Sequence, residues 1–343
     1  MSGILKWILV CAAINLAALF RVEAQTKYNI VFYNVENLFD TWDDPDTSDE
    51  EFTPANEKHW TRERFAEKIK MIYKTLITTG NGQFPDIIGL AEVENRWVCE
   101  QLISKTPLSK VPYEIIHKES PDSRGIDVAL LYRTDRVKPI DYDHIPVADQ
   151  GKNLFNSRDI LYFTAELEDE RFHFFVNHWP SRSGGYIETR EKREFTARLL
   201  RNYLDSLVLK DRDANILLMG DFNATPNEKC FTEILRAFPY PGNNNPSGLI
   251  NLSTLWTRTA DGTIRAGGQW EIFDQMICSY PLLSNNAFKI EFGLSGICNY
   301  DFLLEPDPTW LGKKPFRTYL GPKYHSGISD HLPVKICISA KQP

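Results

Sequence analysis

After its first 24 residues the chain has little cysteine, no long apolar run and no excess of positive charge. The remaining cysteines are widely spaced and form no CxxC pair, which argues against a disulfide framework or a zinc cluster. Either one bridge or buried single thiols stay compatible with them. They are Cys99, Cys230, Cys278, Cys298 and Cys337. No run reaches the roughly 18 apolar residues that a membrane-spanning helix needs. Because repeats and long linkers are also absent, we expect a single domain over residues 25–343.

The N-terminus is the one strongly apolar segment. Lys6 precedes the apolar run Trp7 to Phe20, and small residues stand at Val22 and Ala24 before Gln25. This pattern is typical of a secretory signal peptide, and the run is too short to span a membrane. We therefore expect cleavage near Ala24, removal of residues 1–24, and a secreted or periplasmic protein. An uncleaved membrane anchor is the alternative.

The charge balance is acidic. The formal net charge is −7, and it becomes −8 when Lys6, Arg21 and Glu23 leave with the signal peptide. Such a surface disfavours binding of polyanions through bulk electrostatics, although a local basic cleft stays compatible with it. The segment from Asp40 to Phe52 carries much of the acid. It lacks the ligand spacing of an EF-hand, so we interpret it as a solvated loop.

Short apolar runs rich in β-branched and aromatic residues recur along the chain and predict strands. They cover 28–33, 86–91, 128–132, 161–167, 172–176, 215–219, 272–278 and 334–339. Apolar residues at helical spacing predict helices at 61–78 and 188–209. Many strands with few helices indicate sheets that pack on each other or are covered by helices.

Acidic, amide and histidine residues cluster where predicted strands end. The motifs are NVEN, EVEN, NHWPSR and GDFNATP, and SDHLP stands just before the last strand. Solvated loops would be richer in Lys, Ser and Gly. A shared site built from several strand ends explains the repetition better.

GDFNATP and SDHLP contain the residues of acid–base chemistry. Asp221 can accept a proton from water and Asn223 can orient that water, or the motif is an ordinary turn before Pro226. His331 can face the substrate. Such an imidazole usually needs a carboxylate to fix its tautomer, and Asp274 is the candidate.

Carboxylates near the other strand ends suggest a cation site. Glu92, Glu36 and Asp330 could surround one hard divalent ion, Mg²⁺ or Mn²⁺, which oxygen ligands suit better than zinc. A charged strand end at the surface is the alternative for Glu92. In NHWPSR, His178 could donate a proton, and a stacking ring and a phosphate ligand could come from Trp179 and Arg182. An ordinary polar turn is the alternative there.

These motifs, in this order, resemble the endonuclease/exonuclease/phosphatase superfamily with its deoxyribonuclease-I-like fold, from about Tyr28 to Ser339. The opening YNVENLFD also resembles secreted bacterial members. Carried over by motif, Glu92 matches the principal metal-binding glutamate, with Glu36 and Asp330 near the metal. The other matches are Asn34, Arg158 and His178 toward the phosphate, Asp221 and Asn223 as base and orienting amide, and Asp274 with His331 as a dyad.

The resemblance implies an α+β sandwich of four layers, in which helices flank two packed, mostly antiparallel sheets and the site lies at one rim. It also implies Mg²⁺-dependent hydrolysis of phosphate esters, with Mn²⁺ as a possible substitute. We expect a nuclease-like phosphodiesterase that acts on nucleic acid and works as a monomer without a stable protein partner. The alternatives are a phospholipid headgroup or sphingomyelin-type substrate, a phosphomonoesterase, and a non-catalytic binding domain.

Overall fold

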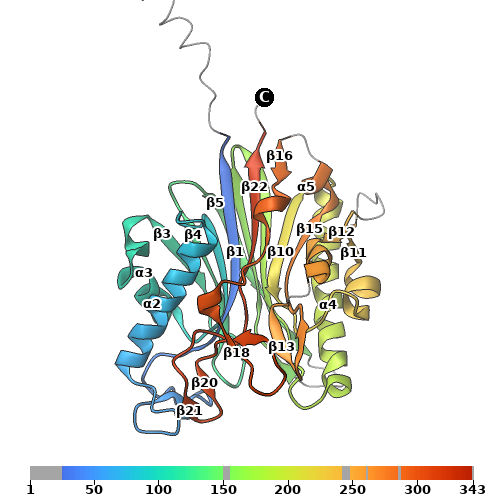
Figure 1. The fold of residues 1–343 in the computed structure, drawn as a ribbon. Helices are drawn as coiled ribbons and strands as arrows, with labels where there is room; N and C mark the ends of the chain where they lie inside the picture. Colours follow the sequence, from blue (N-terminus) through green and yellow to red (C-terminus); the bar gives the residue numbers. More distant parts are fainter. Residues whose placement is uncertain (1–24, 150–154, 242–247, 260–261, 285–286, 342–343) are drawn as a thin grey trace, which may run out of the picture.

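A computed structural model describes residues 25–149, 155–241, 248–259, 262–284 and 287–341. Two seven-stranded sheets lie face to face at its centre, with helices outside each (Figure 1). The first sheet contains β3 (Tyr113–His117), β4 (Asp127–Arg133), β2 (Ile87–Val93), β1 (Lys27–Leu38), β22 (Val334–Ala340) and β16 (Phe288–Ile290), with β17 (Gly296–Ile297) also on β22. The second contains β5 (Lys138–Ile145), β8 (Ile160–Leu167), β9 (Glu170–His178), β10 (Asn215–Asp221), β15 (Asp274–Ser279), β12 (Leu249–Asn251) and β11 (Ala237–Pro239).

The helices form the two outer layers. They are α2 (Arg62–Thr79) and α3 (Arg96–Ser104) beside the first sheet, α4 (Tyr186–Lys210) beside the second, and the short α5 (Tyr280–Ser284), with a π-helical turn at Cys230–Leu235. Four two-stranded hairpins complete the fold: β6 (Ala148–Asp149) with β7 (Phe155–Asn156), β13 (Ile264–Ala266) with β14 (Gln269–Glu271), β18 (Leu304–Pro306) with β19 (Lys313–Pro315), and β20 (Tyr319–Leu320) with β21 (Lys323–Tyr324). In Figure 1, β13, β18, β20 and β21 lie at the lower end of the sheets, away from the C-terminus.

The pairing is mostly antiparallel, as expected. The parallel pairs in the two main sheets are β1 with β2, β9 with β10, and β11 with β12. The predicted α+β sandwich with four layers is confirmed by this arrangement and by the positions of the helices.

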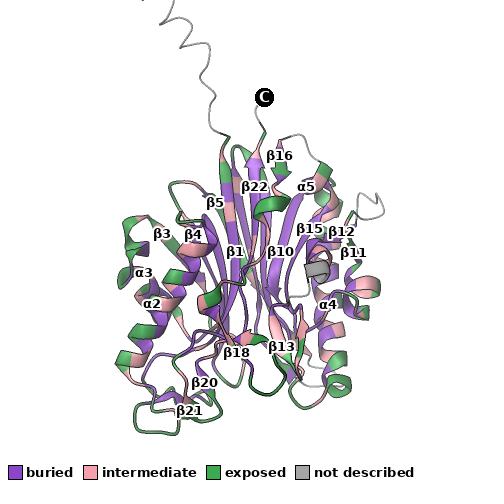
Figure 2. Ribbon diagram, viewed as in Figure 1, coloured by how far each residue is buried: buried purple, intermediate pink, exposed green. Residues whose placement is uncertain are grey.

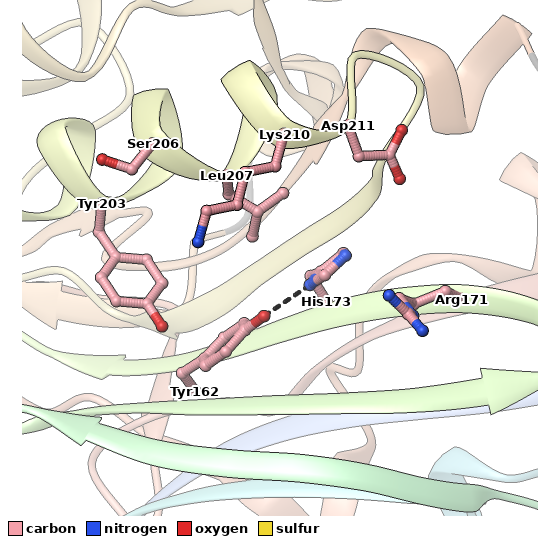
Figure 3. Close-up of a pocket in the computed structure, with 8 residues that line it drawn as sticks. All are labelled: Tyr162, Arg171, His173, Tyr203, Ser206, Leu207, Lys210 and Asp211. Carbon is pink, nitrogen blue, oxygen red and sulfur yellow. Dashed lines mark hydrogen bonds between the residues drawn. The ribbon is translucent and has the colours of Figure 1, made fainter.

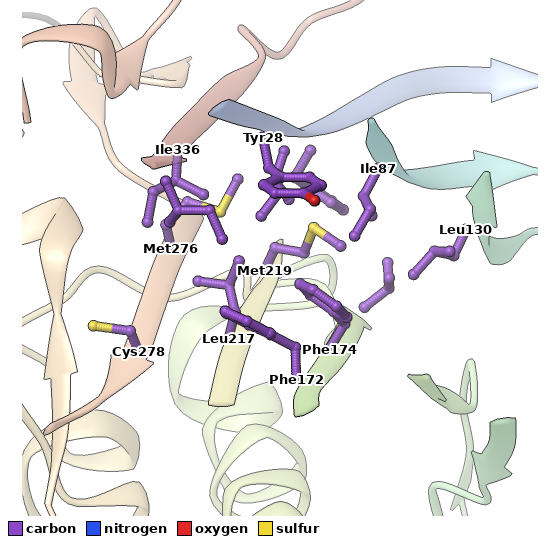
Figure 4. Close-up of a cluster of buried hydrophobic side chains, with 14 of the residues drawn as sticks. Tyr28, Ile87, Leu130, Phe172, Phe174, Leu217, Met219, Met276, Cys278 and Ile336 are labelled. Atoms are coloured by element: carbon purple, nitrogen blue, oxygen red, sulfur yellow. The ribbon is translucent and has the colours of Figure 1, made fainter. Parts of the chain in front are cut away.

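Three apolar clusters fill the spaces between the four layers. Ile30 and Phe32 of β1 belong to the cluster between the two sheets, together with Phe174 and Met219 of the second sheet. Figure 4 shows part of this cluster. Their neighbours Val31 and Tyr33 point the other way, to α2 and α3. A third cluster joins the second sheet to α4. Central strands are therefore buried on both faces (Figure 2), which explains why they read as continuous apolar runs.

The two predicted helices are confirmed at α2 and α4. Along α2, Phe65, Ile69, Ile72 and Leu76 are buried at helical spacing. The Thr61 side chain accepts a hydrogen bond from the Arg64 N–H and caps the first turn. The edge strand β5 was not predicted, because its residues are almost all exposed and carry no apolar pattern.

Other expectations can be compared with the described residues. The five cysteines are buried and unpaired, which agrees with single thiols. No helix among the described residues is long and apolar enough to cross a membrane. The acidic segment is not simply solvated: Asp49 is buried and accepts hydrogen bonds from the Asp44 N–H. The expected signal peptide lies outside the described residues.

Candidate active site

Strand register brings three predicted residues into one row. Asp221 ends β10, and it lies opposite His178 on β9 and opposite Asp274 on β15. Residues directly opposite each other in neighbouring strands project from the same face of a sheet. These residues are far apart in the sequence, but the fold brings their side chains together at the end of the second sheet.

The strand before Asp221 must approach β9 closely. A Cβ atom on Gly220 would lie 2.3 Å from the backbone oxygen of Asn177, closer than real Cβ atoms come. Glycine is thus required here by contact with the neighbouring strand. Its absence of a side chain lets His178 and Asp221 stand side by side.

Two adjacent bulges shape the end of the first sheet. Glu36 and Asn37 on β1 have φ of 49° and 54°, and Glu92 on β2 has φ of 62°. The β1–β2 register shifts between Asn34 and Leu38. Left-handed backbone is uncommon for residues other than glycine, and bulges often re-aim side chains beside functional sites. Here the bulges turn the Glu92 carboxylate toward Asn34 and the Asn37 N–H, which donate to it over 3.3 and 2.9 Å.

His331 comes from the segment before β22 and forms the expected dyad geometry. Its Nδ1 lies 2.7 Å from Asp274 Oδ2, and its backbone N–H donates to Ser329 Oγ over 3.0 Å. Burial alone would lower the pKa of His331, but the carboxylates of Asp274 and Asp221 outweigh it and raise that pKa well above its usual value. The ring is therefore an imidazolium at neutral pH.

Asp221 lies at the centre of the site. Its Oδ2 accepts a hydrogen bond from Asn34 Nδ2 over 3.0 Å, and lies 3.6 Å from His178 Nε2 and 3.7 Å from His331 Nε2. Burial raises the pKa of Asp221 to about 6, although the charge of His331 opposes this. A carboxylate that titrates near neutral pH is suited to general-base work.

Asn223 was interpreted either as an orienting amide or as part of an ordinary turn, and the structure places it in a turn next to Asp221. Its backbone N–H donates to Asp221 Oδ1 over 2.9 Å, which is an Asx-type turn, and its φ is 49°. Its Nδ2 donates to the backbone oxygen of Trp179 over 3.0 Å. The turn therefore fixes Asp221, and the amide nitrogen of Asn223 is already engaged with protein.

His178 is buried and neutral. Burial lowers its pKa well below the usual value, and the charges of Arg158 and Arg124 lower it further. Its Nε2 lies 3.8 Å from Glu92 Oε1, whereas its Nδ1 is buried without a hydrogen-bond partner. The ring thus lies between the carboxylates of the two sheets.

Glu36 does not have the environment that the sequence suggested. Both of its carboxylate oxygens are engaged: Oε1 accepts from Arg317 over 2.9 and 3.0 Å, and Oε2 from the Thr318 N–H over 2.7 Å. Burial and the nearby Asp330 raise the pKa of Glu36 to about 7. In this structure Glu36 holds Arg317 in place and is not a free metal ligand.

Sequence reasoning missed two cations of the site. Arg317 bridges Glu36 and Asp330, with Nη2 3.0 Å from Asp330 Oδ2. Lys68 is buried in α2 and donates to the backbone oxygen of Glu36 and, over 2.8 Å, to Thr318 Oγ1. Burial lowers the pKa of Lys68 to about 8, while the carboxylates of Glu36, Glu92 and Asp330 oppose this. No sequence motif marks Arg317.

Trp179 and Arg182 were expected to contact the substrate, but in the structure both side chains are engaged by protein groups. The Trp179 side chain is 1% exposed, stacks on Phe231 and donates to Asn177 Oδ1, so its ring cannot stack on a base. Arg182 donates to the backbone oxygen of Asn223 and pairs with Glu228 and Glu271 over 2.6 and 2.7 Å. Each of its three guanidinium nitrogens donates to a protein group, and these bonds position the turn after β10.

Arg158 is also held by protein, although it lies near His178. Its Nη1 donates to Asp122 Oδ2 over 2.9 Å and its Nη2 to the Trp179 backbone oxygen over 2.8 Å. Its Nε is buried without a partner. Arg158 therefore contributes positive charge beside the site from a buried position.

The donor set fits a hard divalent cation. Glu92 and Asp330 are partly exposed, with side chains 14% and 28% accessible. Arg317 donates to Asp330 Oδ2, but both carboxylates keep unused lone pairs. Oxygen donors of this kind suit Mg²⁺ or Mn²⁺. Asp221, Asp274 and His331 also have donor atoms within 4.8 Å of one another, but the hydrogen bond between Asp274 and His331 already uses two of these residues.

A separate cavity of about 270 Å³ lies between α4 and the outer face of the second sheet. Tyr162, His173 and Tyr203 contribute rings to it, and Tyr162 Oη lies 2.7 Å from His173 Nδ1 (Figure 3). His173 and His178 lie five residues apart along β9, on the order of 17 Å, so this cavity is not part of the site described above.

Comparison with known proteins agrees with the fold and the motifs. The model of the endonuclease/exonuclease/phosphatase family matches residues 29–340, so the chain belongs to that family of phosphoester hydrolases. No curated protein matches the chain. The structure of the human nocturnin catalytic domain with bound sulfate is similar, with a TM-score of 0.56 and 16% identity over 93% of this chain and 97% of that one.

Two further solved structures show the same fold. The TDP2 protein of D. rerio, complexed with a single-strand DNA product, has a TM-score of 0.55 and 14% identity over 91% of this chain and 99% of that one. A mannosyl-6-phosphatase of Bacteroides thetaiotaomicron has a TM-score of 0.53 and 15% identity over 90% of this chain and 98% of that one. At such identities the likeness concerns the fold alone, and the named substrates differ.

Proposed function

We propose that the protein is a secreted or periplasmic, Mg²⁺-dependent phosphodiesterase of the nuclease-like type. The observation that carries this proposal is the row of His178, Asp221 and Asp274, with His331 bonded to Asp274 over 2.7 Å. This row contains a candidate base, a neutral ring and a charged imidazolium within one small volume. Such a set suits hydrolysis of a phosphodiester, in which positioning and charge stabilisation supply most of the acceleration.

Glu92 and Asp330 would hold the cation, which when bound would polarise the phosphate and neutralise charge that develops on it. Asp221 accepts the proton of the attacking water, because its pKa near 6 leaves it ionised at neutral pH. His331 is positively charged through Asp274 and faces the same carboxylate, so it can stabilise or protonate a developing oxyanion. Asn34 orients Asp221 and Glu92 together.

The choice of a diester over a monoester follows from the cations. A phosphate dianion calls for several free cationic groups, yet Arg158 and Arg182 are both engaged by protein groups. Arg317 also donates to Glu36 and Asp330, but its side chain is 42% exposed and can reach a substrate. One partly exposed arginine suits a singly charged diester better.

Hydrolysis of bis(p-nitrophenyl) phosphate by the purified protein tests the proposal. We expect turnover with Mg²⁺ or Mn²⁺, none with EDTA, and loss in Asp221→Ala and His331→Ala. Turnover that survives EDTA, or that is undiminished in both variants, would contradict it. A panel of plasmid DNA, RNA, sphingomyelin and inositol phosphates then identifies the substrate class. Release of a lipid headgroup without nicking of DNA would show that the protein is a lipid phosphodiesterase and not a nuclease.

A further inference from the structure

A second histidine–carboxylate cluster lies at the edge of the first sheet, outside the site described above. His117 ends β3, Asp127 begins β4, and Glu119 lies in the connection between them. One donor atom from each of these three side chains lies within 4.8 Å of the other two. We call this set the β3–β4 cluster.

Two atoms of the β3–β4 cluster are buried without a partner. His117 Nε2 and Asp127 Oδ2 lie 3.7 Å apart, on side chains that are each 2% exposed, and neither atom has a hydrogen-bond partner. Hydrogen bonds from nitrogen to oxygen span about 2.7–3.2 Å, so this separation is too long for one. Two tetrahedral ligands with bonds of about 2.1 Å to one ion would lie roughly 3.4 Å apart. Buried polar atoms without partners call for an ion or a water.

The other side chains of the cluster do not fill the space between His117 Nε2 and Asp127 Oδ2. Asp127 Oδ1 accepts hydrogen bonds from the backbone N–H and the hydroxyl of Ser120, which fixes the carboxylate and aims Oδ2 at His117. Glu119 Oε1 lies 4.0 Å from the Nδ1 of the same ring, on a side chain that is 65% exposed. The cluster therefore has two buried donors and one exposed carboxylate.

We propose that His117, Glu119 and Asp127 bind one divalent transition-metal ion, with Zn²⁺ as the best fit. One imidazole nitrogen and two carboxylate oxygens leave a fourth, tetrahedral position for water. The nitrogen donor distinguishes this set from the all-oxygen carboxylates that suit Mg²⁺. The ion would be a second one, distinct from the cation expected at Glu92 and Asp330.

The position of this ion suggests a structural role. It would join both ends of the 118–126 connection. From that connection, Asp122 holds Arg158, and the charge of Arg124 acts on His178. Closing a loop at its base restricts the positions that its residues sample. The bound ion would thus fix charged groups that lie beside the catalytic histidine.

Calorimetric titration of the protein with Zn²⁺ in excess Mg²⁺ tests the proposal. The Glu92→Ala background removes the catalytic cation site, Glu119→Gln removes the mobile ligand, and Glu114→Gln changes an exposed carboxylate on β3 as the matched control. We expect one Zn²⁺ per chain in the background and the control, and at least about tenfold weaker binding with Glu119→Gln. Because Glu119 is exposed, this variant should keep its fold, which circular dichroism checks.

Bound Co²⁺ gives an independent readout, since tetrahedral cobalt absorbs visible light and Mg²⁺ does not. The proposal predicts this absorption in the background and its loss with Glu119→Gln. Absence of Zn²⁺ binding, or equal binding in Glu119→Gln and the background, would overturn it. The carboxylates of Asp127 and Glu119 would then share a proton in place of an ion.

Discussion

The candidate active site and the β3–β4 cluster both pair a buried histidine with carboxylates. The pKa of the histidine is shifted upward in the first and downward in the second. In the first, His331 Nδ1 is 2.7 Å from Asp274. In the second, His117 Nε2 is 3.7 Å from Asp127 and forms no hydrogen bond. The pKa of His331 is raised well above its usual value, whereas that of His117 is lowered to about 4. The pKa shifts of the two buried histidines therefore have opposite signs.

The backbone accounts for this difference. Asp274 and Asp221 are paired in register, so two carboxylates face His331 and their combined charge outweighs the cost of burial. Asp127 is held back by Ser120, and burial then dominates at His117. His331 thus has one carboxylate at hydrogen-bond distance and a second 3.7 Å away, whereas His117 has no carboxylate closer than 3.7 Å.

Breaking the catalytic dyad should have the largest effect. Asp274→Asn removes the charge that raises the pKa of His331, so the ring loses its proton and its fixed tautomer at neutral pH. We expect kcat/KM for bis(p-nitrophenyl) phosphate to fall by about 10²–10⁴-fold. Asp141→Asn, an exposed change on β5, is the control and should keep full turnover. A loss below tenfold for Asp274→Asn would show that the dyad does not carry the chemistry.

The dependence of stability on pH should separate the two histidines. Without metal, the folded pKa of His117 is about 4 and its ordinary value about 6.5, so between these values the unfolded state binds more protons. Its contribution to the free energy of unfolding is present above pH 6.5 and is lost as pH falls toward 4, on the order of 3 kcal/mol.

His117→Gln should flatten that slope in urea unfolding with EDTA present, and the exposed His59→Gln should not. His331 has the opposite sign: its contribution is present below its ordinary pKa and is lost as pH rises through its raised one. An unchanged slope with His117→Gln would show that the ring is not buried as a neutral group.

Arg182→Ala tests how far the turn after β10 positions Asp221 in the candidate active site. Because Arg182 holds the backbone of Asn223 and pairs with Glu228 and Glu271, its loss should misplace the turn that fixes Asp221. We expect kcat to fall about tenfold with little change in KM, a loss of roughly 1.4 kcal/mol. Arg190→Ala, on the exposed side of α4, is the control. A rise in KM alone would instead assign Arg182 to substrate binding.

Trp179→Phe should have the smallest effect. The ring stack on Phe231 can persist, and the loss is the hydrogen bond to Asn177, about 0.5–1.5 kcal/mol in the free energy of unfolding. Because Trp179 is buried, KM should not change for any substrate in the panel. A KM that rises selectively for nucleic acid would show that the Trp179 ring stacks on a base of the substrate.

The sequence predicted much of the fold because the central strands are buried on both faces and therefore read as apolar runs. It also indicated which strand ends carry the site. It could not give register, so the row of His178, Asp221 and Asp274 emerged only from the pairing of β9, β10 and β15. The orientation of Trp179 and Arg182 was equally hidden, because a residue just after a strand can turn to either side.

Of the missed residues, Lys68 had a visible signal and Arg317 had none. Lys68 lies on the apolar stripe of α2, three residues after Phe65 and four before Ile72, where a charge is costly unless it is paired. Its pairing with Thr318 and Glu36 is the reason for that position. Arg317 reaches Glu36 from 281 residues away along the chain, and only the fold brings them together.

The most direct test of the account is the initial rate of bis(p-nitrophenyl) phosphate hydrolysis by Asp221→Asn and by the unchanged protein, at saturating Mg²⁺ and neutral pH. Asparagine keeps the shape of Asp221 but cannot accept the proton of a water. The account predicts a rate about 10²–10⁴-fold lower for the variant, with its fold and melting temperature retained. Equal rates would contradict the assignment of the catalytic centre to the end of β10.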